Sequence, residues 1–319
     1  MRNFYISEKD YEAKMMDTVM PYLSERRSDA YFDGYDKNPI HYVAYKVENS
    51  IGSVVVSHGF TESTEKFHEL TYYFLLSGYN VFLADHRGHG KSYRTLDDKT
   101  LTHITAFDEY VSDFSLFVDE VKRFEKGDII LFCHSMGCAV GLLFLEKNPT
   151  VFKRAFISSP MVVPNPGSIP LFLARAMAKS MIIFGKSEKR AFISKEYPGK
   201  EIFADSCKTS ESRFNEYEML KRKNKELQNY SPTYGWVYAS LKVGGRILKK
   251  GEVEKIKIPV FAAIASRDDV VLRKSQDKLV KRLPHCRSKV FDAKHEIYGS
   301  ADDVAFDYFD CLLDFIGEK

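Results

Sequence analysis

The 319-residue chain is long enough for one large α/β domain with a sizeable insertion, or for two ordinary domains. A hydrophobic fraction of 44% and an aromatic fraction of 14% exclude an intrinsically disordered protein. The net charge of +3 is too small to indicate nucleic-acid binding, and no uncharged apolar run reaches the roughly 18 residues of a membrane-spanning helix.

The amino-terminal residues and the cysteines bear on cellular location. Residues 1–20 lack the continuous apolar core of a signal peptide, and the five cysteines are scattered without a C-x-x-C pair. Both features predict a soluble, cytoplasmic protein with reduced thiols. Cys133 and Cys138 stand close to Ser135, and we interpret them as small buried side chains rather than as catalytic thiols.

The first half of the chain alternates short β-branched runs with longer helical stretches. Residues 1–29 are interpreted as helical or irregular, and 30–34 and 41–47 as two antiparallel strands. Further strands are predicted at 53–56, 81–84, 128–132 and 155–158, and helices at 66–77, 108–124 and 138–147. This alternation predicts an α/β fold with a mostly parallel central sheet covered by helices on both faces.

The alternation stops near residue 160 and resumes near residue 258. Residues 160–257 show helical periodicity without strand signals; they are followed by a strand at 258–264, a helix to about 283, a strand at 288–291 and a helix to 315. We therefore predict a core made of 1–159 and 258–319, with 160–257 inserted as a helical cap, or lid. The cap holds 19 Lys and Arg against 10 Asp and Glu, a net charge of +9, which favours it as the surface that meets an anionic membrane.

The segment ILFCHSMG, which contains Ser135, carries the strongest chemical signal. A strand runs into this serine, and Gly137 and a helix follow it, which is typical of the nucleophile elbow G-x-S-x-G of α/β-hydrolases. The first glycine of the motif is replaced by Cys133, a residue still small enough for the turn. The pattern predicts Ser135 as a catalytic nucleophile.

A serine nucleophile needs a base, and the base needs an acid that holds its tautomer. In the α/β-hydrolase fold these partners follow the serine in the order acid, then histidine. Asp268 and Asp269 follow the strand at 258–264, and His295 follows the last strand, so we predict His295 as the base. For the acid we favour Asp268, with Asp269 as the alternative.

The transition state of ester cleavage also needs two amide donors for its oxyanion. We expect one from Met136, directly after the nucleophile, and the other from Phe60, in the loop after the first parallel strand. The histidine pair His86 and His89 is interpreted as part of a glycine-rich structural loop rather than a metal site. The basic run at 221–223 is interpreted as a solvated helix face.

Several segments in order resemble the bacterial lysophospholipase and monoacylglycerol lipase branch of the α/β-hydrolases. They are VVVSHGFTES, KFHELTYYFLLSGYNVFLADHRGHGKS, HITAFDEYVSDF, FCHSMG, SSPMVVP, SPTYGWVYAS and AKHEI, and together they span roughly residues 50–316. The resemblance implies hydrolysis of an acyl ester of a single-chain lipid, with the triad on Ser135, Asp268 and His295. It also suggests Trp236 near the substrate tunnel, with plain packing of the cap as the alternative, and it implies no metal or organic cofactor.

Two classes of alternative function remain open on sequence alone. The first is another chemistry on the same triad, such as that of a thioesterase, an acyltransferase or an aminopeptidase. The second is a non-catalytic binding module, which the filled triad positions disfavour. The expected partners are a small lipid ester and, through the basic cap, an anionic membrane surface contacted peripherally; the sequence does not indicate an oligomeric state.

Overall fold

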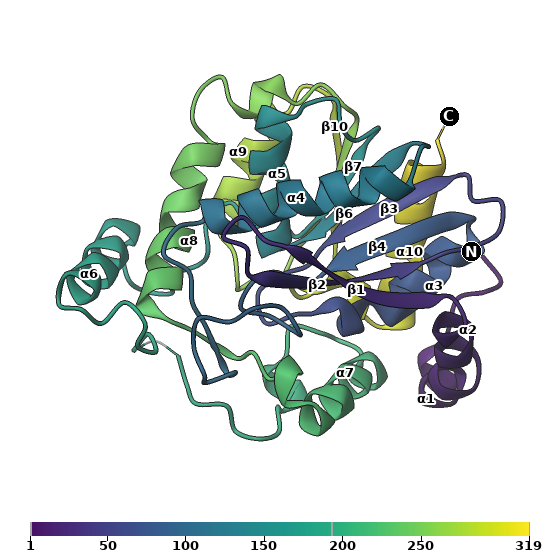
Figure 1. The fold of residues 1–319 in the computed structure, drawn as a ribbon, viewed down its shortest axis with the longest axis horizontal. Coiled ribbons are helices and arrows are strands. Elements are labelled where there is room, and N and C mark those ends of the chain that lie inside the picture. Colours follow the sequence, from purple (N-terminus) through teal and green to yellow (C-terminus); the bar gives the residue numbers. More distant parts are fainter. Residues whose placement is uncertain (1, 193, 319) are drawn as a thin grey trace.

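The computed structural model describes residues 2–192 and 194–318. Within them an eight-stranded sheet has the order β1-β2-β4-β3-β6-β7-β9-β10 (Figure 1). Its strands are β1 (Arg27–Asp33), β2 (Pro39–Tyr45), β3 (Gly52–Ser57), β4 (Tyr79–Ala84), β6 (Ile129–His134), β7 (Ala155–Ser158), β9 (Val260–Ala265) and β10 (Cys286–Phe291). β2 pairs antiparallel with both β1 and β4, and the other neighbours are parallel. The predicted α/β fold with a mostly parallel sheet is confirmed.

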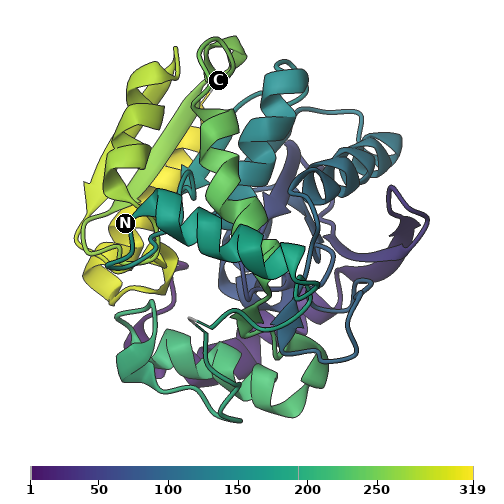
Figure 2. The same ribbon diagram turned by 90° about the vertical axis from the view of Figure 1, so that its left-hand side faces the viewer.

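Helices cover both faces of this sheet (Figures 1 and 2). α3 (His68–Leu76) and α10 (Asp302–Gly317) bury apolar residues against one face, and α4 (Asp108–Phe124), α5 (Met136–Lys147) and α9 (Arg273–Arg282) against the other. The central strands therefore bury the side chains of both their faces, and this explains why β3 and β6 read as continuous apolar runs rather than as alternating ones.

The helices expected at 66–77 and 138–147 differ from the structure mainly at their first turns, and α3 ends one residue earlier than expected. A 3₁₀ turn (Thr64–Phe67) precedes α3, and α5 begins two residues before the expected position, at Met136. Helix ends are the part of an element that periodicity defines least well, since the terminal amides have no partner within the helix.

Residues 8–24 form a short, irregular helical segment. It consists of a 3₁₀ turn (Glu8–Asp10), α1 (Tyr11–Lys14), a π-helical turn (Met15–Val19) and α2 (Met20–Ser24). Tyr11, Met15, Val19 and Leu23 recur every fourth residue, so they share one face, and all four are buried in the apolar cluster of α3 and α10. The segment therefore packs against one side of the core.

The chain between β7 and β9 combines helices with long irregular stretches. It contains α6 (Leu171–Ile183), α7 (Glu211–Lys223), α8 (Tyr234–Ile247) and three short 3₁₀ turns (Phe203–Asp205, Lys225–Leu227 and Val253–Lys255). The expectation of no strand in this segment is wrong for two residues, because β8 (Ser231–Pro232) pairs with β5 (Leu101–Thr102). A two-residue pairing is too short to leave a periodic signal. Among the described residues, no helix is long and apolar enough to cross a bilayer.

Glu146, near the end of α5, gives a pH-dependent test of the fold. Burial, together with Glu252, raises the pKa of Glu146 to about 7, and its Oε1 has no hydrogen-bond partner among the described residues. An acid whose folded pKa lies above its unfolded value costs stability as pH rises through that interval. We therefore expect Glu146→Gln to raise the melting temperature at pH 8 and to change it much less at pH 4.5. Thermal unfolding at both pH values checks this; an equal shift at the two would contradict it.

Candidate active site

Ser135 makes the whole connection between β6 and α5. Its backbone has φ 50° and ψ −116°, a conformation that is strained for a residue with a Cβ. Gly137 allows α5 to approach β3, because a Cβ at this glycine would lie 2.0 Å from the Ser57 carbonyl oxygen. The turn therefore has the geometry of a nucleophile elbow, in which the serine hydroxyl projects from the end of the strand.

Ser135, His295 and Asp268 follow the carboxyl ends of β6, β10 and β9 and form one hydrogen-bonded chain. The Ser135 Oγ lies 2.8 Å from His295 Nε2, and His295 Nδ1 lies 2.7 Å from Asp268 Oδ2. Asp269 is exposed, so the structure places Asp268 rather than Asp269 against the histidine. This arrangement allows the imidazole to accept the serine proton while the carboxylate holds its other nitrogen.

The Asp268 carboxylate is held by the backbone as well as by the histidine. Its Oδ1 accepts hydrogen bonds from the amides of Val270 at 2.9 Å and Val271 at 3.1 Å. Burial alone would raise the pKa of Asp268, but the hydrogen bonds from His295 and from the two amides hold it below its ordinary value. The group is therefore ionised at neutral pH and accepts from Nδ1–H.

Ser159 holds the loop that carries His295 in place. The Ser159 hydroxyl donates to the His295 carbonyl oxygen at 2.6 Å, and the Ser159 amide donates to the Ala263 carbonyl oxygen of β9 at 2.8 Å. Ser159 has φ 44°, so its backbone is strained in the same way as that of the nucleophile. Contacts at the carboxyl ends of β7 and β9 thus position the imidazole of His295.

Phe60 and Met136 come from two different segments beside the serine. Phe60 lies in the turn after β3 and Met136 at the start of α5, and within the described residues neither backbone amide donates to another segment or to a side chain, as an oxyanion donor requires. The ring of Trp236, on α8, packs on that of Phe60 with 4.1 Å between centroids. Trp236 is buried in the core cluster, so the structure places it beside the loop that carries one expected oxyanion donor.

A family model described as serine aminopeptidase, S33 (Hydrolase_4) matches residues 48–302. The chain belongs to this family. It is 28% identical over 256 residues to a probable lysophospholipase L2 of Haemophilus influenzae, a match that covers 79% of both chains. It is also 28% identical to the lysophospholipase L2 of Escherichia coli K12, over 70% of this chain and 66% of that one.

The fold of this S33-family chain is shared by a soluble variant of the monoglyceride lipase of Saccharomyces cerevisiae. The two structures superpose with a TM-score of 0.72 at 18% sequence identity, over 92% of this chain and 95% of that one. At this identity the likeness concerns the fold alone. Together with the family match, it confirms the resemblance to α/β-hydrolases of the lysophospholipase and monoacylglycerol lipase branch.

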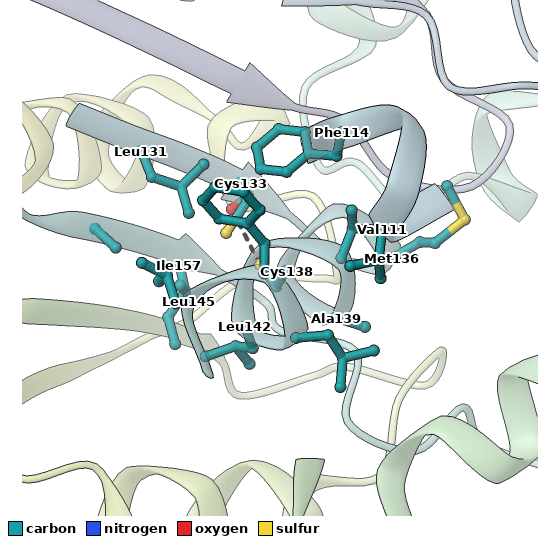
Figure 3. Packing of buried hydrophobic residues seen from close by; sticks show 14 of the residues in the cluster. Val111, Phe114, Leu131, Cys133, Met136, Cys138, Ala139, Leu142, Leu145 and Ile157 are labelled. Atoms are coloured by element: carbon teal, nitrogen blue, oxygen red, sulfur yellow. Dashed lines mark hydrogen bonds between the residues drawn. The ribbon is translucent and has the colours of Figure 1, made fainter. Parts of the chain in front are cut away.

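Cys133 and Cys138, which flank Ser135 in this S33-family chain, are packed away from solvent (Figure 3). The Cys138 thiol donates to the Cys133 carbonyl oxygen at 3.1 Å, inside an apolar cluster with Leu131 and Ile157. Burial raises the pKa of Cys138 well above its ordinary value, so the thiol stays protonated at neutral pH. The interpretation of both cysteines as small buried side chains is confirmed.

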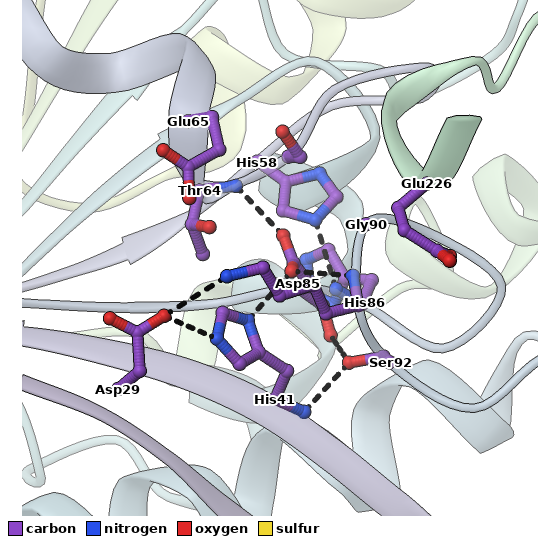
Figure 4. A network of polar contacts seen from close by, with 12 residues as sticks. Asp29, His41, His58, Thr64, Glu65, Asp85, His86, Gly90, Ser92 and Glu226 are labelled. Atoms are coloured by element: carbon purple, nitrogen blue, oxygen red, sulfur yellow. Dashed lines mark hydrogen bonds and ion pairs between the residues drawn. The ribbon is translucent and has the colours of Figure 1, made fainter. Parts of the chain in front are cut away.

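His86 packs against His58, in the loop after β3 that also carries Phe60 (Figure 4). His86 Nε2 lies 2.9 Å from the Ser57 hydroxyl, and the His86 amide donates to His58 Nε2 at 2.9 Å. Burial holds the pKa of both His86 and His89 well below the ordinary value, so both are neutral. In the part of the chain that the structure describes, no three His, Cys, Asp or Glu side chains are grouped to hold a metal ion.

Two buried polar residues beside the site were not singled out from the sequence. Glu62 lies two residues beyond Phe60, and His134 directly precedes Ser135. Both are almost fully buried, and His134 Nδ1 donates to Glu62 Oε2 at 3.1 Å. No local signal in the sequence identifies them, because a carboxylate is buried only where donors surround it, and the donors to Glu62 come from distant segments.

Proposed function

We propose that this chain is a serine hydrolase that cleaves the carboxylic ester of single-chain lipids through an acyl-enzyme on Ser135. The observation that carries the proposal is the hydrogen-bonded chain from Ser135 through His295 to Asp268 at a strained elbow. The names of its relatives, lysophospholipase L2, and of its structural neighbour, a monoglyceride lipase, support a single-chain lipid ester as the substrate class.

The proposed reaction has two steps on the same residues. His295 Nε2 takes the proton of Ser135 as Oγ attacks the ester carbonyl, and the resulting oxyanion is bound by the amides of Phe60 and Met136. His295 then gives this proton to the departing alcohol, which leaves an acyl group on the serine. Water, deprotonated by the same histidine, attacks the acyl-enzyme. His295 then returns that proton to Ser135 Oγ as the bond between Oγ and the acyl carbon breaks, and the fatty acid is released.

The segment 160–257 is proposed to act as the lid of this site. α8 brings Trp236 against Phe60, so the lid contacts the oxyanion loop directly. A chain enclosed between lid and core gains roughly 0.8 kcal/mol per buried methylene, whereas a second acyl chain would stay in water. This favours monoacyl over diacyl lipids and triacylglycerols, with Trp236 beside the entering acyl group.

We propose that α6 is the part of the lid that touches an anionic lipid surface, by a peripheral contact. Phe172 and Phe184, at its two ends, are 76% and 74% exposed, although phenylalanine is ordinarily buried. The exposed lysines Lys179, Lys186 and Lys189 accompany them and attract anionic head groups. An apolar surface beside cations is typical of a peripheral membrane contact.

The basic run 221–223 does not form one continuous binding surface. Lys221 is buried, donates to the Asn229 carbonyl oxygen at 3.2 Å and pairs with Glu201. The interpretation of the run as a solvated face is therefore wrong for this lysine, because it packs inward from α7; Arg222 and Lys223 are exposed. Membrane attraction is better assigned to the lysines that accompany the exposed rings of α6.

We expect the double variant Phe172→Asp, Phe184→Asp to bind anionic vesicles at least about tenfold more weakly, since each exposed ring contributes up to roughly 2 kcal/mol on burial. Turnover of a short soluble ester should stay unchanged. Phe124→Asp, a ring that is 54% exposed on α4, is the matched control and should bind as the parent does. Vesicle sedimentation at two salt concentrations measures the binding of the parent, the double variant and the control. Equal binding by these three proteins would contradict the assignment to α6.

A substrate panel tests the proposed chemistry against its alternatives. It consists of a monoacylglycerol, lysophosphatidylcholine, an acyl-CoA and an aminoacyl amide, each assayed with the parent protein. The family description names an aminopeptidase, so the amide arm is a direct test of that chemistry. Fastest turnover on either monoacyl ester supports the proposal, and fastest turnover on the amide or the thioester overturns it. The absence of labelling by a fluorophosphonate would indicate a non-catalytic binding module.

A further inference from the structure

The loop after β3 turns sharply around Phe60, and the side chain of Glu62 closes it. The Gly59 amide donates to Glu62 Oε2, so the loop is folded back on itself across two residues. A Cβ on Gly59 would lie 2.8 Å from the same oxygen, which shows how closely the carboxylate approaches the backbone. The position of the Phe60 amide therefore depends on this contact.

The same turn stores backbone strain at Thr61. Its φ of 62° lies in the left-handed region, which a β-branched residue rarely adopts. Such conformations persist only where the surroundings hold them, and they tend to cluster at functional sites. Thr61 lies between Phe60 and Glu62, so the bond from the Gly59 amide to the carboxylate spans the strained residue.

The other carboxylate oxygen of Glu62 reaches the loop that carries the base. Its Oε1 accepts from the Tyr298 hydroxyl at 2.6 Å, and Tyr298 lies in a 3₁₀ turn (Ile297–Gly299) that starts two residues after His295. Lys66 Nζ lies 2.9 Å from the same oxygen and 2.7 Å from Glu296 Oε1. One carboxylate thus bonds the oxyanion loop and, by two routes, the histidine loop.

His134 connects Glu62 to the nucleophile as well. Its Nδ1 donates to Glu62 Oε2 at 3.1 Å, and its ring lies 5.0 Å from the His295 ring, measured between centroids. Burial would raise the pKa of Glu62, but His134 and Lys66 together hold it well below its ordinary value. The group is an ionised, almost fully buried carboxylate that touches three active-site segments.

We propose that the Glu62 carboxylate preorganises the oxyanion hole by holding the Phe60 turn against the loop of His295. It is a positioning residue, since it acts through the Phe60 amide and the imidazole and does not itself meet the substrate. The inference rests on the proposed hydrolase function. It adds to that function the residue that holds the Phe60 turn and the His295 loop in their relative positions before the ester binds.

The test is Glu62→Gln, which keeps the size of the side chain but replaces one acceptor oxygen with a donor group. Removal of one oxyanion donor costs about 100-fold to 1000-fold in turnover, so a misplaced donor should lower kcat by about 10-fold to 100-fold with KM changed less than about threefold. The affinity for a trifluoromethyl ketone, which forms an oxyanion on Ser135, should fall by the same factor. Titration of active sites with a fluorophosphonate corrects both values for unfolded protein.

Glu69→Gln is the matched control. Glu69 is also a buried glutamate with several donors, namely the hydroxyls of Tyr11 at 2.9 Å and Tyr73 at 2.8 Å and the guanidinium of Arg213. These donors lie on the amino-terminal segment, α3 and α7; Arg213 also donates to the Ser300 carbonyl oxygen at 3.1 Å, but Glu69 itself bonds none of the triad residues and does not contact Glu62 in the described hydrogen bonds. This variant should lose thermal stability while keeping kcat and ketone affinity. An equal loss of kcat in both variants would reduce Glu62 to a structural role and overturn the inference.

Tyr298→Phe covers the case in which Glu62→Gln does not fold, because it removes a single bond to the same carboxylate. We expect it to lower kcat and ketone affinity in parallel, by about threefold to tenfold, which is less than the full value of a hydrogen bond to a charged group because Lys66 and His134 still hold the carboxylate. Unchanged values overturn the inference. Ser135→Ala distinguishes failure of the proposed function from failure of the inference about Glu62. If Ser135→Ala still cleaves esters, the proposed function is wrong. If it is inactive while Glu62→Gln is fully active, only the role of Glu62 is wrong.

Discussion

Ser135→Ala is expected to lower ester turnover by about six orders of magnitude, the loss that accompanies removal of the nucleophile in serine hydrolases. The hydroxyl is the group that is hydrogen-bonded to His295 Nε2, at 2.8 Å. Cys133, the nearest thiol in sequence, is buried in the apolar core cluster. Cys138 is buried as well, and its raised pKa keeps its thiol protonated at neutral pH. Steady-state kinetics on a monoacyl ester, together with fluorophosphonate labelling, measure the loss.

Cys133→Gly is a useful companion to that variant. It introduces the glycine of the usual elbow motif at a position where the side chain is buried in the core cluster and makes one weak hydrogen bond, 3.8 Å from Sγ to the Phe156 carbonyl oxygen. The triad is untouched, so activity should remain within a few-fold while the lost packing lowers stability. A Ser135→Ala protein that still labels, or a Cys133→Gly protein that does not, would show that the nucleophile is wrongly assigned.

The elements that could be predicted are those that residues close together in the sequence determine. The strand before Ser135 and the helix after it follow from an apolar run, a small residue and Gly137, all within nine residues of sequence. The order of strands and helices along the chain predicted where Asp268 and His295 should lie, because in a parallel sheet every carboxyl end reaches the same edge. The geometry of the candidate triad could therefore be anticipated without a structure.

The features that could not be predicted depend on contacts between distant residues. Glu62 meets His134 and Tyr298 across separations of 72 and 236 residues, and nothing in its own neighbourhood indicates that it is buried. Lys221 reads as part of a basic surface run until its pairing with Glu201 is seen. In each case the charge alone predicts a solvated side chain, and tertiary packing decides the outcome.

The choice between Asp268 and Asp269 as the acid leads to a prediction with an internal control. Asp268 Oδ1 accepts from two backbone amides, and its Oδ2 accepts from His295 Nδ1. In Asp268→Asn the amides of Val270 and Val271 keep the side-chain oxygen, because only an acceptor satisfies them. The side-chain NH₂ must then face Nδ1, which forces that nitrogen to become an acceptor and places the ring proton on Nε2.

An imidazole with its proton on Nε2 cannot accept the proton of Ser135, so Asp268→Asn should lower kcat/KM by about four orders of magnitude, as a wrong tautomer does in serine proteases. Asp269→Asn changes an adjacent, exposed carboxylate in the same way without touching the histidine, and should stay within a few-fold of the parent. Parallel kinetics of the two variants on one soluble ester, with thermal unfolding to verify that both are folded, measure the difference. Comparable losses, or a larger loss for Asp269→Asn, would place the acid elsewhere, because only a carboxylate bonded to Nδ1 can set the tautomer that the reaction needs.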